Sequence, residues 1–116
     1  MTVYIAGGIT GIENYKARFA AAKRMLLRTG EDRLNSVARY YGTPRADKVL
    51  NPAELPEDWP GRVYMDVCLA MIRAADLVVF LPGWEQSRGA RLEMKYCRYC
   101  KQVYKIEEEE LEGWME

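Results

Sequence analysis

Apolar residues occur along the chain in two patterns, short unbroken runs and longer stripes with a helical period. The runs are typical of parallel strands covered on both faces, and the stripes are typical of amphipathic helices. The most pronounced run, 77–81, is stopped by Pro82 and Gly83 and is followed by a helical pattern over 91–99. We therefore predict a buried strand, a turn and a helix at the centre of the fold.

Strands and helices alternate along the rest of the sequence. The predicted strands are 2–6, 49–51, 77–81 and 102–106, and the predicted helices are 13–28, 62–74 and 91–99. The polar segment 31–48, with a possible short helix over 34–41, is predicted to be an insertion. Alternation of this kind predicts parallel strands joined by right-handed crossovers. The expected fold class is α/β, a small flavodoxin-like three-layer fold with a parallel sheet in strand order 2-1-3-4.

The stripes also predict which face of each helix is buried. In the helix 62–74 the predicted buried side carries Val63, Val67, Ala70, Met71 and Ala74. In the helix 13–28 the predicted stripe is Tyr15, Phe19, Ala22 and Leu26. The acidic run 107–110 is expected to be the solvated start of a helix.

Length and charge narrow the class of protein. The 116 residues are enough for one domain, 1–116. The 17 basic and 17 acidic side chains balance, so the net charge predicts neither a nucleic-acid nor a membrane partner. No apolar run approaches the roughly 20 residues of a membrane helix, and the chain opens on a strand pattern without signal-peptide features. We expect a cytoplasmic location.

Residue types that bind metals are scarce. There are three cysteines and no histidine. Cys97 and Cys100 are one helical turn apart, but a zinc site would need further ligands. The cysteines are therefore expected to be structural, with no metal and no cofactor. Without histidine, any catalysis depends on carboxylates, tyrosines, hydroxyls or thiols.

Parallel sheets bind ligands beyond the carboxyl ends of their strands, at the switch point between the first and third strands in this order. The residues expected at that edge are Gly7, Gly8 and Thr10 after the first strand, Asn51 after the second, Trp84, Ser87, Arg88 and Gly89 after the third, and Asp66 and Glu93 at helix starts. The glycines could form a tight turn with or without a ligand beside it. Asp76 falls at the opposite edge and is expected to be a turn residue.

Two carboxylates at one edge favour glycosyl chemistry. Departure of a sugar substituent through an oxocarbenium-like state needs a carboxylate nucleophile and a proton donor. Glu93 and Asp66 could fill these roles. The alternatives are that Glu93 stabilises a helix dipole and that Asp66 lies on a solvated face.

Three motifs in this order resemble the nucleoside 2-deoxyribosyltransferase superfamily, which includes 2'-deoxynucleoside 5'-phosphate N-hydrolases. They are Val3-Tyr4-Ile5-Ala6-Gly7, Tyr64-Met65-Asp66 followed by Asp76, and Ser87-Arg88-Gly89-Ala90-Arg91-Leu92-Glu93. The resemblance implies that Glu93 is the nucleophile, that Tyr4 holds it by a hydrogen bond, and that Asp66 protonates the departing base. It also implies that Gly7 and Gly8 approach the sugar or base. Ser87 matches the serine with which the hydrolases contact phosphate.

The implied function is cleavage or transfer at the N-glycosidic bond of a 2'-deoxynucleoside or its 5'-monophosphate. A phosphate could bind the helix start after Ser87, with help from Arg88 and Arg91. The expected partner is a small-molecule nucleoside or nucleotide. We also expect a homo-oligomer, with an apolar residue such as Trp114 or Tyr96 in its interface. The alternatives are a non-catalytic nucleotide-binding module and a small assembly protein.

Overall fold

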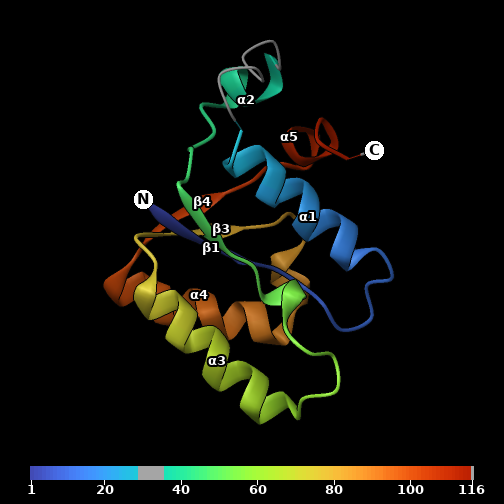
Figure 1. Cartoon of the computed structure of the whole chain (residues 1–116), viewed down its shortest axis with the longest axis vertical. Coiled ribbons are helices and arrows are strands. Elements are labelled where there is room, and N and C mark those ends of the chain that lie inside the picture. The colour runs from blue at the N-terminus through green and yellow to red at the C-terminus, as the bar shows by residue number, and fades with distance from the viewer. Residues whose placement is uncertain (29–35, 116) are drawn as a thin grey trace.

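The computed structural model in Figure 1 describes residues 1–28 and 36–115. Its described part contains a sheet of four parallel strands in the order β2-β1-β3-β4. The strands are β1 (Thr2–Ala6), β2 (Lys48–Leu50), β3 (Leu77–Phe80) and β4 (Gln102–Lys105). The predicted α/β class and the predicted strand order are therefore confirmed.

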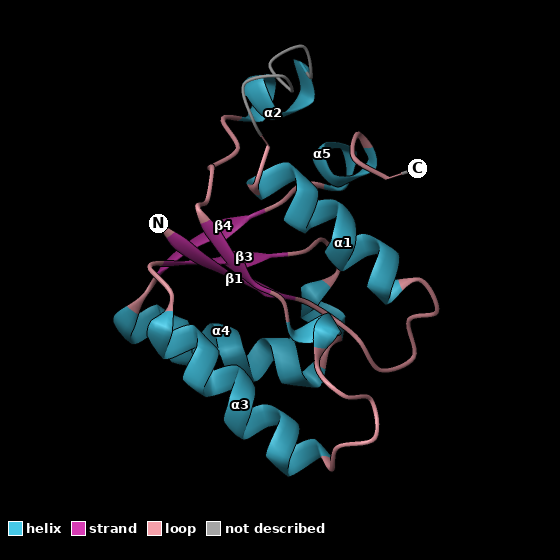
Figure 2. Ribbon diagram, in the orientation of Figure 1, coloured by secondary structure: helices cyan, strands magenta, loops and turns pink. Residues whose placement is uncertain are grey.

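Helices cover both faces of this sheet (Figure 2). The helices α1 (Tyr15–Leu26) and α5 (Glu108–Glu112) pack on one face, and α3 (Gly61–Ala74) and α4 (Arg88–Cys100) pack on the other. The short helix α2 (Ser36–Tyr41) lies beyond the sheet near α5, where Tyr41 donates a hydrogen bond to Glu109. No helix in the described residues has the length and apolar character needed to cross a membrane.

The alternation of side chains along β1 separates two cores. Val3 and Ile5 face α1, while Tyr4 and Ala6 face α3 and α4. This alternation follows from the period of two residues in a strand. As a result the Tyr4 side chain, 1% exposed, lies on the same side of the sheet as α4.

Helix boundaries differ from the predicted ones where capping residues intervene. Helix α4 begins at Arg88, three residues before the predicted start, because the Ser87 Oγ accepts a hydrogen bond from the Ala90 N–H and caps it. Strand β2 ends at Leu50 because Asn51 caps the 3₁₀ helix η2 (Pro52–Glu54), which forms within a predicted loop. A second 3₁₀ helix, η3 (Trp84–Gln86), separates β3 from α4.

The predicted buried face of α3 is wrong at three of its five positions, and the other two, Val67 and Met71, are partly buried. Cys68 and Ile72 are the buried residues of this helix, and Val63, Ala70 and Ala74 are exposed. The helix carries apolar residues around most of its circumference, so the period alone could not distinguish the face that meets the sheet. The predicted α1 stripe is confirmed for its three core positions, which are Phe19, Ala22 and Leu26.

The acidic run at 107–110 does begin a helix, but it is not wholly solvated. Glu110 is fully buried, whereas Glu107 and Glu109 are exposed. The Glu110 carboxylate accepts hydrogen bonds from the Thr43 hydroxyl, from the Tyr104 hydroxyl at 2.9 Å and from the Glu107 N–H at 3.1 Å. This carboxylate therefore ties α5 to β4 and to the segment after α2.

The chain around the predicted insertion is also held by one arginine. Arg28 donates hydrogen bonds to the carbonyl groups of Thr43 and Pro44, the second at 2.9 Å. The predicted short helix over 34–41 is present as α2 from Ser36, and its first two predicted residues lie outside the described part of the chain.

Candidate active site

A pocket of about 200 Å³ lies at the carboxyl edge of the sheet. It is formed by β1 and the loop after it (Tyr4, Gly7), by α3 (Tyr64, Cys68) and by the start of α4 (Ser87, Glu93). We call it the Glu93 pocket. Its place between the ends of β1 and β3 is the switch point at which parallel sheets bind ligands.

Glu93 is the one acidic residue among those that line this pocket. It is 5% exposed and accepts a hydrogen bond from the Tyr4 hydroxyl through Oε2. Burial raises the pKa of Glu93 to about 7, and the hydrogen bond from Tyr4 opposes part of this rise. Among the described residues no lysine or arginine forms an ion pair with Glu93. The carboxylate is thus a weakly solvated anion above neutral pH.

Tyr4 and Cys68 stay protonated around this carboxylate. Burial, followed by the negative charge of Glu93, raises the pKa of Tyr4 well above its ordinary value. Burial raises the pKa of the Cys68 thiol to about 11. Tyr4 is therefore a hydrogen-bond donor at any pH at which the protein works, which keeps the Glu93 carboxylate in one orientation.

This arrangement can supply a nucleophile. A carboxylate that is partly desolvated and oriented by one donor can attack an electrophilic carbon presented in the pocket. Among the described residues that line the pocket there is no second carboxylate to act as an acid.

A family model described as a domain of unknown function (DUF4406) matches residues 37–105. The match covers more than half of the 116 residues. The chain belongs to the DUF4406 family. The matched range includes α3, β3 and α4, and hence Glu93, whereas Tyr4 lies before it. No curated protein and no solved structure matches this chain.

Six of the residues predicted for the site line the Glu93 pocket of this DUF4406 protein, namely Tyr4, Gly7, Thr10, Ser87, Gly89 and Glu93. Gly8 borders it, because a Cβ at this position would come within 3.4 Å of the Ser87 Cβ and within 2.7 Å of the Ile12 Cδ1. A larger residue at 8 would have to displace the Ile12 side chain.

Three predicted binding residues have other surroundings. The Asn51 side chain accepts a hydrogen bond from the Ala53 N–H at 2.9 Å and caps η2. The Trp84 ring packs on Phe80 with 5.3 Å between ring centroids, and the Lys105 Nζ lies 5.7 Å from its centroid. Arg88 is exposed. None of these three is among the residues that line the Glu93 pocket.

Asp66 is exposed on α3 and does not line the Glu93 pocket. Successive residues of an α-helix are separated by about 100°, so Asp66 points roughly 200° away from Cys68, two positions later. Because Cys68 faces the pocket, the Asp66 carboxylate faces outward. The structure therefore does not bring the two predicted catalytic carboxylates together in one chain.

Sequence reasoning missed the α3 side of the pocket. Tyr64, Met65 and Cys68 line it. The signal was present in the spacing of Tyr64, Cys68 and Ile72, which recurs every four residues and marks one helix face. The more regular stripe of small apolar residues on the outer face hid it.

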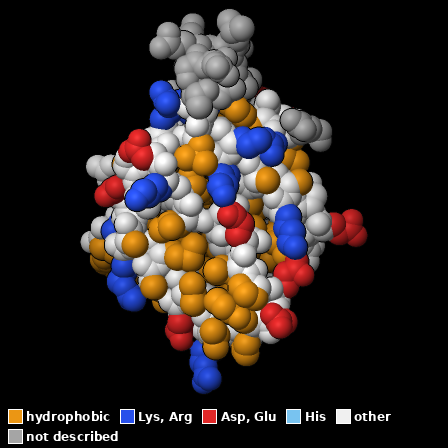
Figure 3. Space-filling view, viewed as in Figure 1, with side chains coloured by type: hydrophobic (Ala, Val, Ile, Leu, Met, Phe, Trp, Pro, Cys, Tyr) orange, Lys and Arg blue, Asp and Glu red, His pale blue; other side chains and the backbone are white. Residues whose placement is uncertain are grey.

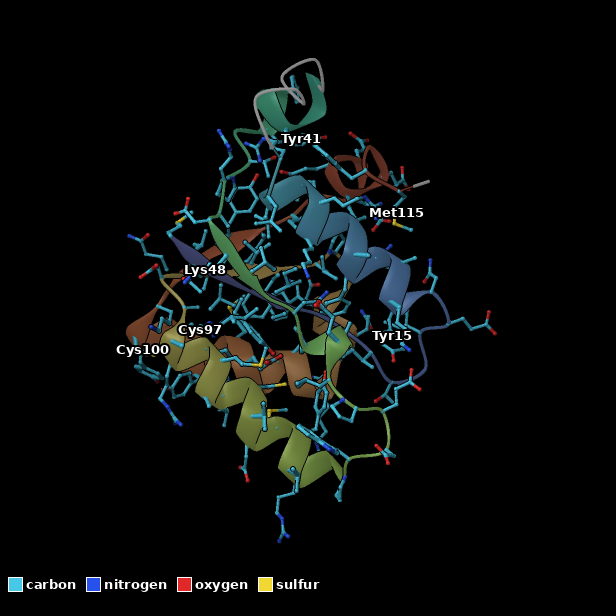
Figure 4. The ribbon with its side chains drawn as sticks, in the orientation of Figure 1. Tyr15, Tyr41, Lys48, Cys97, Cys100 and Met115 are labelled. Atoms are coloured by element: carbon cyan, nitrogen blue, oxygen red, sulfur yellow. The ribbon has the colours of Figure 1, made fainter. Side chains whose placement is uncertain are left out.

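The remaining predictions concern Asp76 and the cysteines. Asp76 accepts a hydrogen bond from the Thr2 N–H at 2.8 Å at the amino edge of the sheet, which confirms its role as a turn residue. Cys97 is buried against the sheet and Cys100 is exposed at the end of α4 (Figure 4). Among the described residues no group of three or more histidine, cysteine, aspartate or glutamate side chains could hold a metal ion.

The two expected interface residues are partly covered by the chain itself. Trp114 packs against the core on the α1 side, and Tyr96 packs against the core on the α3 and α4 side. The apolar residues that are most exposed on α4 are instead Leu92, at 50%, and Tyr99, at 94%.

Proposed function

We propose that this protein cleaves or transfers the N-glycosidic bond of a 2'-deoxynucleoside or its 5'-monophosphate. The observation that carries the proposal is the buried Glu93 carboxylate, which accepts a hydrogen bond from Tyr4 inside a small pocket at the carboxyl edge of the sheet. This is the pair of residues that the resemblance to the nucleoside 2-deoxyribosyltransferase superfamily implies.

In the proposed reaction an oxygen of Glu93 attacks the anomeric carbon of the sugar. The bond between that carbon and the base nitrogen breaks, and the base leaves with the electron pair and takes up a proton from solvent water. Water or a second base then attacks the same carbon, which releases the Glu93 carboxylate and the product. Tyr4 holds the carboxylate during both steps through its hydrogen bond.

Ser87 and Gly89 are suited to the far end of the sugar. The Ser87 Oγ accepts a hydrogen bond from Ala90 at 3.2 Å, so its O–H proton remains able to donate to a ligand. A phosphate would be held by this hydroxyl and the helix start, because neither Arg88 nor Arg91 lines the pocket and Arg91 donates to the Glu85 carbonyl at 2.8 Å. Both the nucleoside and its 5'-monophosphate therefore belong in the substrate panel.

The test is turnover of a panel of deoxynucleosides and their 5'-monophosphates, with the free base separated by chromatography. We expect release of free base from at least one member of the panel. If the enzyme is a transferase, adding a second base should speed this release and yield the deoxynucleoside of the added base. Ribonucleosides serve as the control. A thermal shift by the same ligands without turnover would favour the alternative of a nucleotide-binding module.

The outer face of α3 supports a proposed homo-oligomer. Val63 is 37% exposed, and Ala70 and Ala74 are also exposed. Figure 3 shows hydrophobic side chains gathered over this region of the molecule. Asp66 lies on the same outward side of the helix. In the proposed oligomer, a second copy packed there would bring its Glu93 pocket toward this carboxylate.

We therefore predict at least a dimer by light scattering at micromolar concentration. A charge in a buried apolar contact is costly, so Val63→Glu should lower the measured mass toward that of one chain. Glu13→Lys changes an exposed residue before α1 and should leave the mass unchanged. A wild-type protein that is monomeric at this concentration would contradict the prediction.

A further inference from the structure

A second cavity, of about 410 Å³, adjoins the Glu93 pocket. The two share Ile9, Thr10, Pro52, Gly61 and Tyr64, so they form one continuous hollow. Three aromatic side chains line the second cavity, those of Tyr15, Trp59 and Tyr64, together with the prolines Pro52 and Pro56. We call it the aromatic vestibule. Aromatic walls with a few polar groups are typical of sites for small organic ligands.

Two of its aromatic rings are held in place by hydrogen bonds. The Tyr15 hydroxyl donates to Glu57 Oε1 at 3.1 Å, and its ring meets Phe19 edge-on with 6.5 Å between centroids. Tyr15 begins α1 beside the loop that follows η2 (Figure 4). The Tyr64 hydroxyl donates to the Pro52 carbonyl at 3.2 Å. The walls are therefore preorganised, which reduces the entropy cost of binding.

The third ring belongs to Trp59, which is 36% exposed. It lies in the short segment between Pro56 and Pro60, where the two prolines restrict the backbone. A tryptophan left partly in water beside a hollow can bury more of its surface when a flat ligand stacks on it. Trp59 is thus the residue of the vestibule that we expect to bury the most additional surface when a ligand binds.

We propose that the aromatic vestibule binds the planar base of the substrate, while the sugar enters the Glu93 pocket. The assignment of base and sugar to the two hollows rests on the proposed function. Stacking suits a nucleobase because each base offers a flat π-face. Trp84, the tryptophan expected at the site from sequence, packs on Phe80 instead.

The test measures binding by tryptophan fluorescence in the Glu93→Gln variant, which should bind ligand without turning it over. The probes are free adenine, 2'-deoxyadenosine and 2-deoxyribose, with other bases added if the activity panel shows a different preference. We expect the two base-containing probes to quench the fluorescence, and we expect Trp59→Phe to remove most of that quenching. Trp84→Phe is the matched control and should keep it.

Loss of stacking should also weaken affinity. Measured by isothermal titration calorimetry, which does not depend on the Trp59 signal, Trp59→Ala is expected to raise the dissociation constant for the base-containing probes by about 10- to 100-fold. It should leave the affinity for 2-deoxyribose unchanged. A melting temperature close to that of the parent would show that Trp59→Ala still folds, and Trp59→Phe serves as the conservative variant if it does not.

The outcomes separate this inference from the proposed function. If a base binds in a way that depends on Trp59 but no substrate is turned over, the vestibule is supported as a base-binding site and the proposed enzymatic activity is contradicted. If the protein turns over substrate, but its KM is unaffected by Trp59→Ala and quenching persists in Trp59→Phe, the vestibule is not the base-binding site. The proposed enzymatic activity would still stand. Failure of every base to bind at millimolar concentration would also overturn the vestibule.

Discussion

Glu93→Gln is expected to lower kcat/KM for the preferred deoxynucleoside or deoxynucleotide by about 10³-fold or more. The amide keeps the shape of the side chain and can still accept the hydrogen bond from Tyr4, but it is a far poorer nucleophile. The wild-type protein, quenched in acid during turnover, should carry the mass of one deoxyribosyl group on a peptide that contains Glu93. The variant should carry none.

The same group should control the pH dependence of the wild-type enzyme. Because burial holds the pKa of Glu93 at about 7, kcat/KM for an uncharged deoxynucleoside should rise with pH until about 7 and then level off. An ordinary exposed glutamate would give a plateau that begins near pH 5. A profile that is flat from pH 5 to 8 would contradict the assignment of Glu93 as the nucleophile.

Stability provides a readout that is independent of turnover. The folded state holds the Glu93 proton up to about pH 7, whereas an unfolded chain releases it near its ordinary value of 4.5. Folding is therefore penalised as pH rises between these values, by a total of roughly 3 kcal/mol above pH 7. Glu93→Gln should be more stable than wild type at pH 8, and this advantage should disappear at pH 4.

The control for these experiments is Glu85→Gln, which changes an exposed carboxylate in η3 that does not line the Glu93 pocket. It should retain wild-type turnover and pH dependence. Full activity in Glu93→Gln would refute both the nucleophile and the proposed mechanism, whatever the behaviour of the control.

Glu110→Ala is expected to destabilise the protein by about 3 kcal/mol or more. The change removes the acceptor of three hydrogen bonds, from the hydroxyls of Thr43 and Tyr104 and from the Glu107 N–H. Each buried donor left without a partner costs about 1–3 kcal/mol. The variant also opens a cavity beside Leu111, which is fully buried on the same helix.

The measurement is the free energy of unfolding in urea at neutral pH. Glu112→Ala removes an exposed carboxylate from the same helix and should change it by less than about 0.5 kcal/mol. Glu110→Gln, which keeps an acceptor oxygen, should fall between the two. Equal stability of Glu110→Ala and Glu112→Ala would show that the buried network does not stabilise the fold.

The identity of most elements was predictable because their signals are local. The unbroken run at 77–81 is typical of a covered strand, and the turn residues Pro82 and Gly83 end it. The position of Glu93 at the carboxyl edge was also predictable, because the order of strands in a parallel sheet decides which loops meet at one edge, whereas Tyr4 was expected beside it only from the family resemblance. The hydrogen bond between them followed from the family resemblance rather than from this rule.

The face of α3 that meets the sheet and the burial of Glu110 were not predictable from local signals. A helix with apolar residues around most of its circumference has no single face, and the contact with the sheet selects Cys68 and Ile72. That rotation turns Asp66 outward and brings Tyr64 to the pocket. Glu110 looks like its acidic neighbours in sequence, and only donors from distant segments, Thr43 and Tyr104, make its burial tolerable.

The sequence by itself determined the parallel sheet, its strand order and the edge at which Glu93 lies, because period and chain order are properties of neighbouring residues. Only the tertiary structure decided which carboxylates are buried and which rings surround the pocket. Burial depends on contacts between segments far apart in the chain, such as the bond that joins Tyr15 to Glu57. Burial raises the pKa of Glu93, and the packing of distant segments places Trp59 in the vestibule and Tyr64 in both hollows.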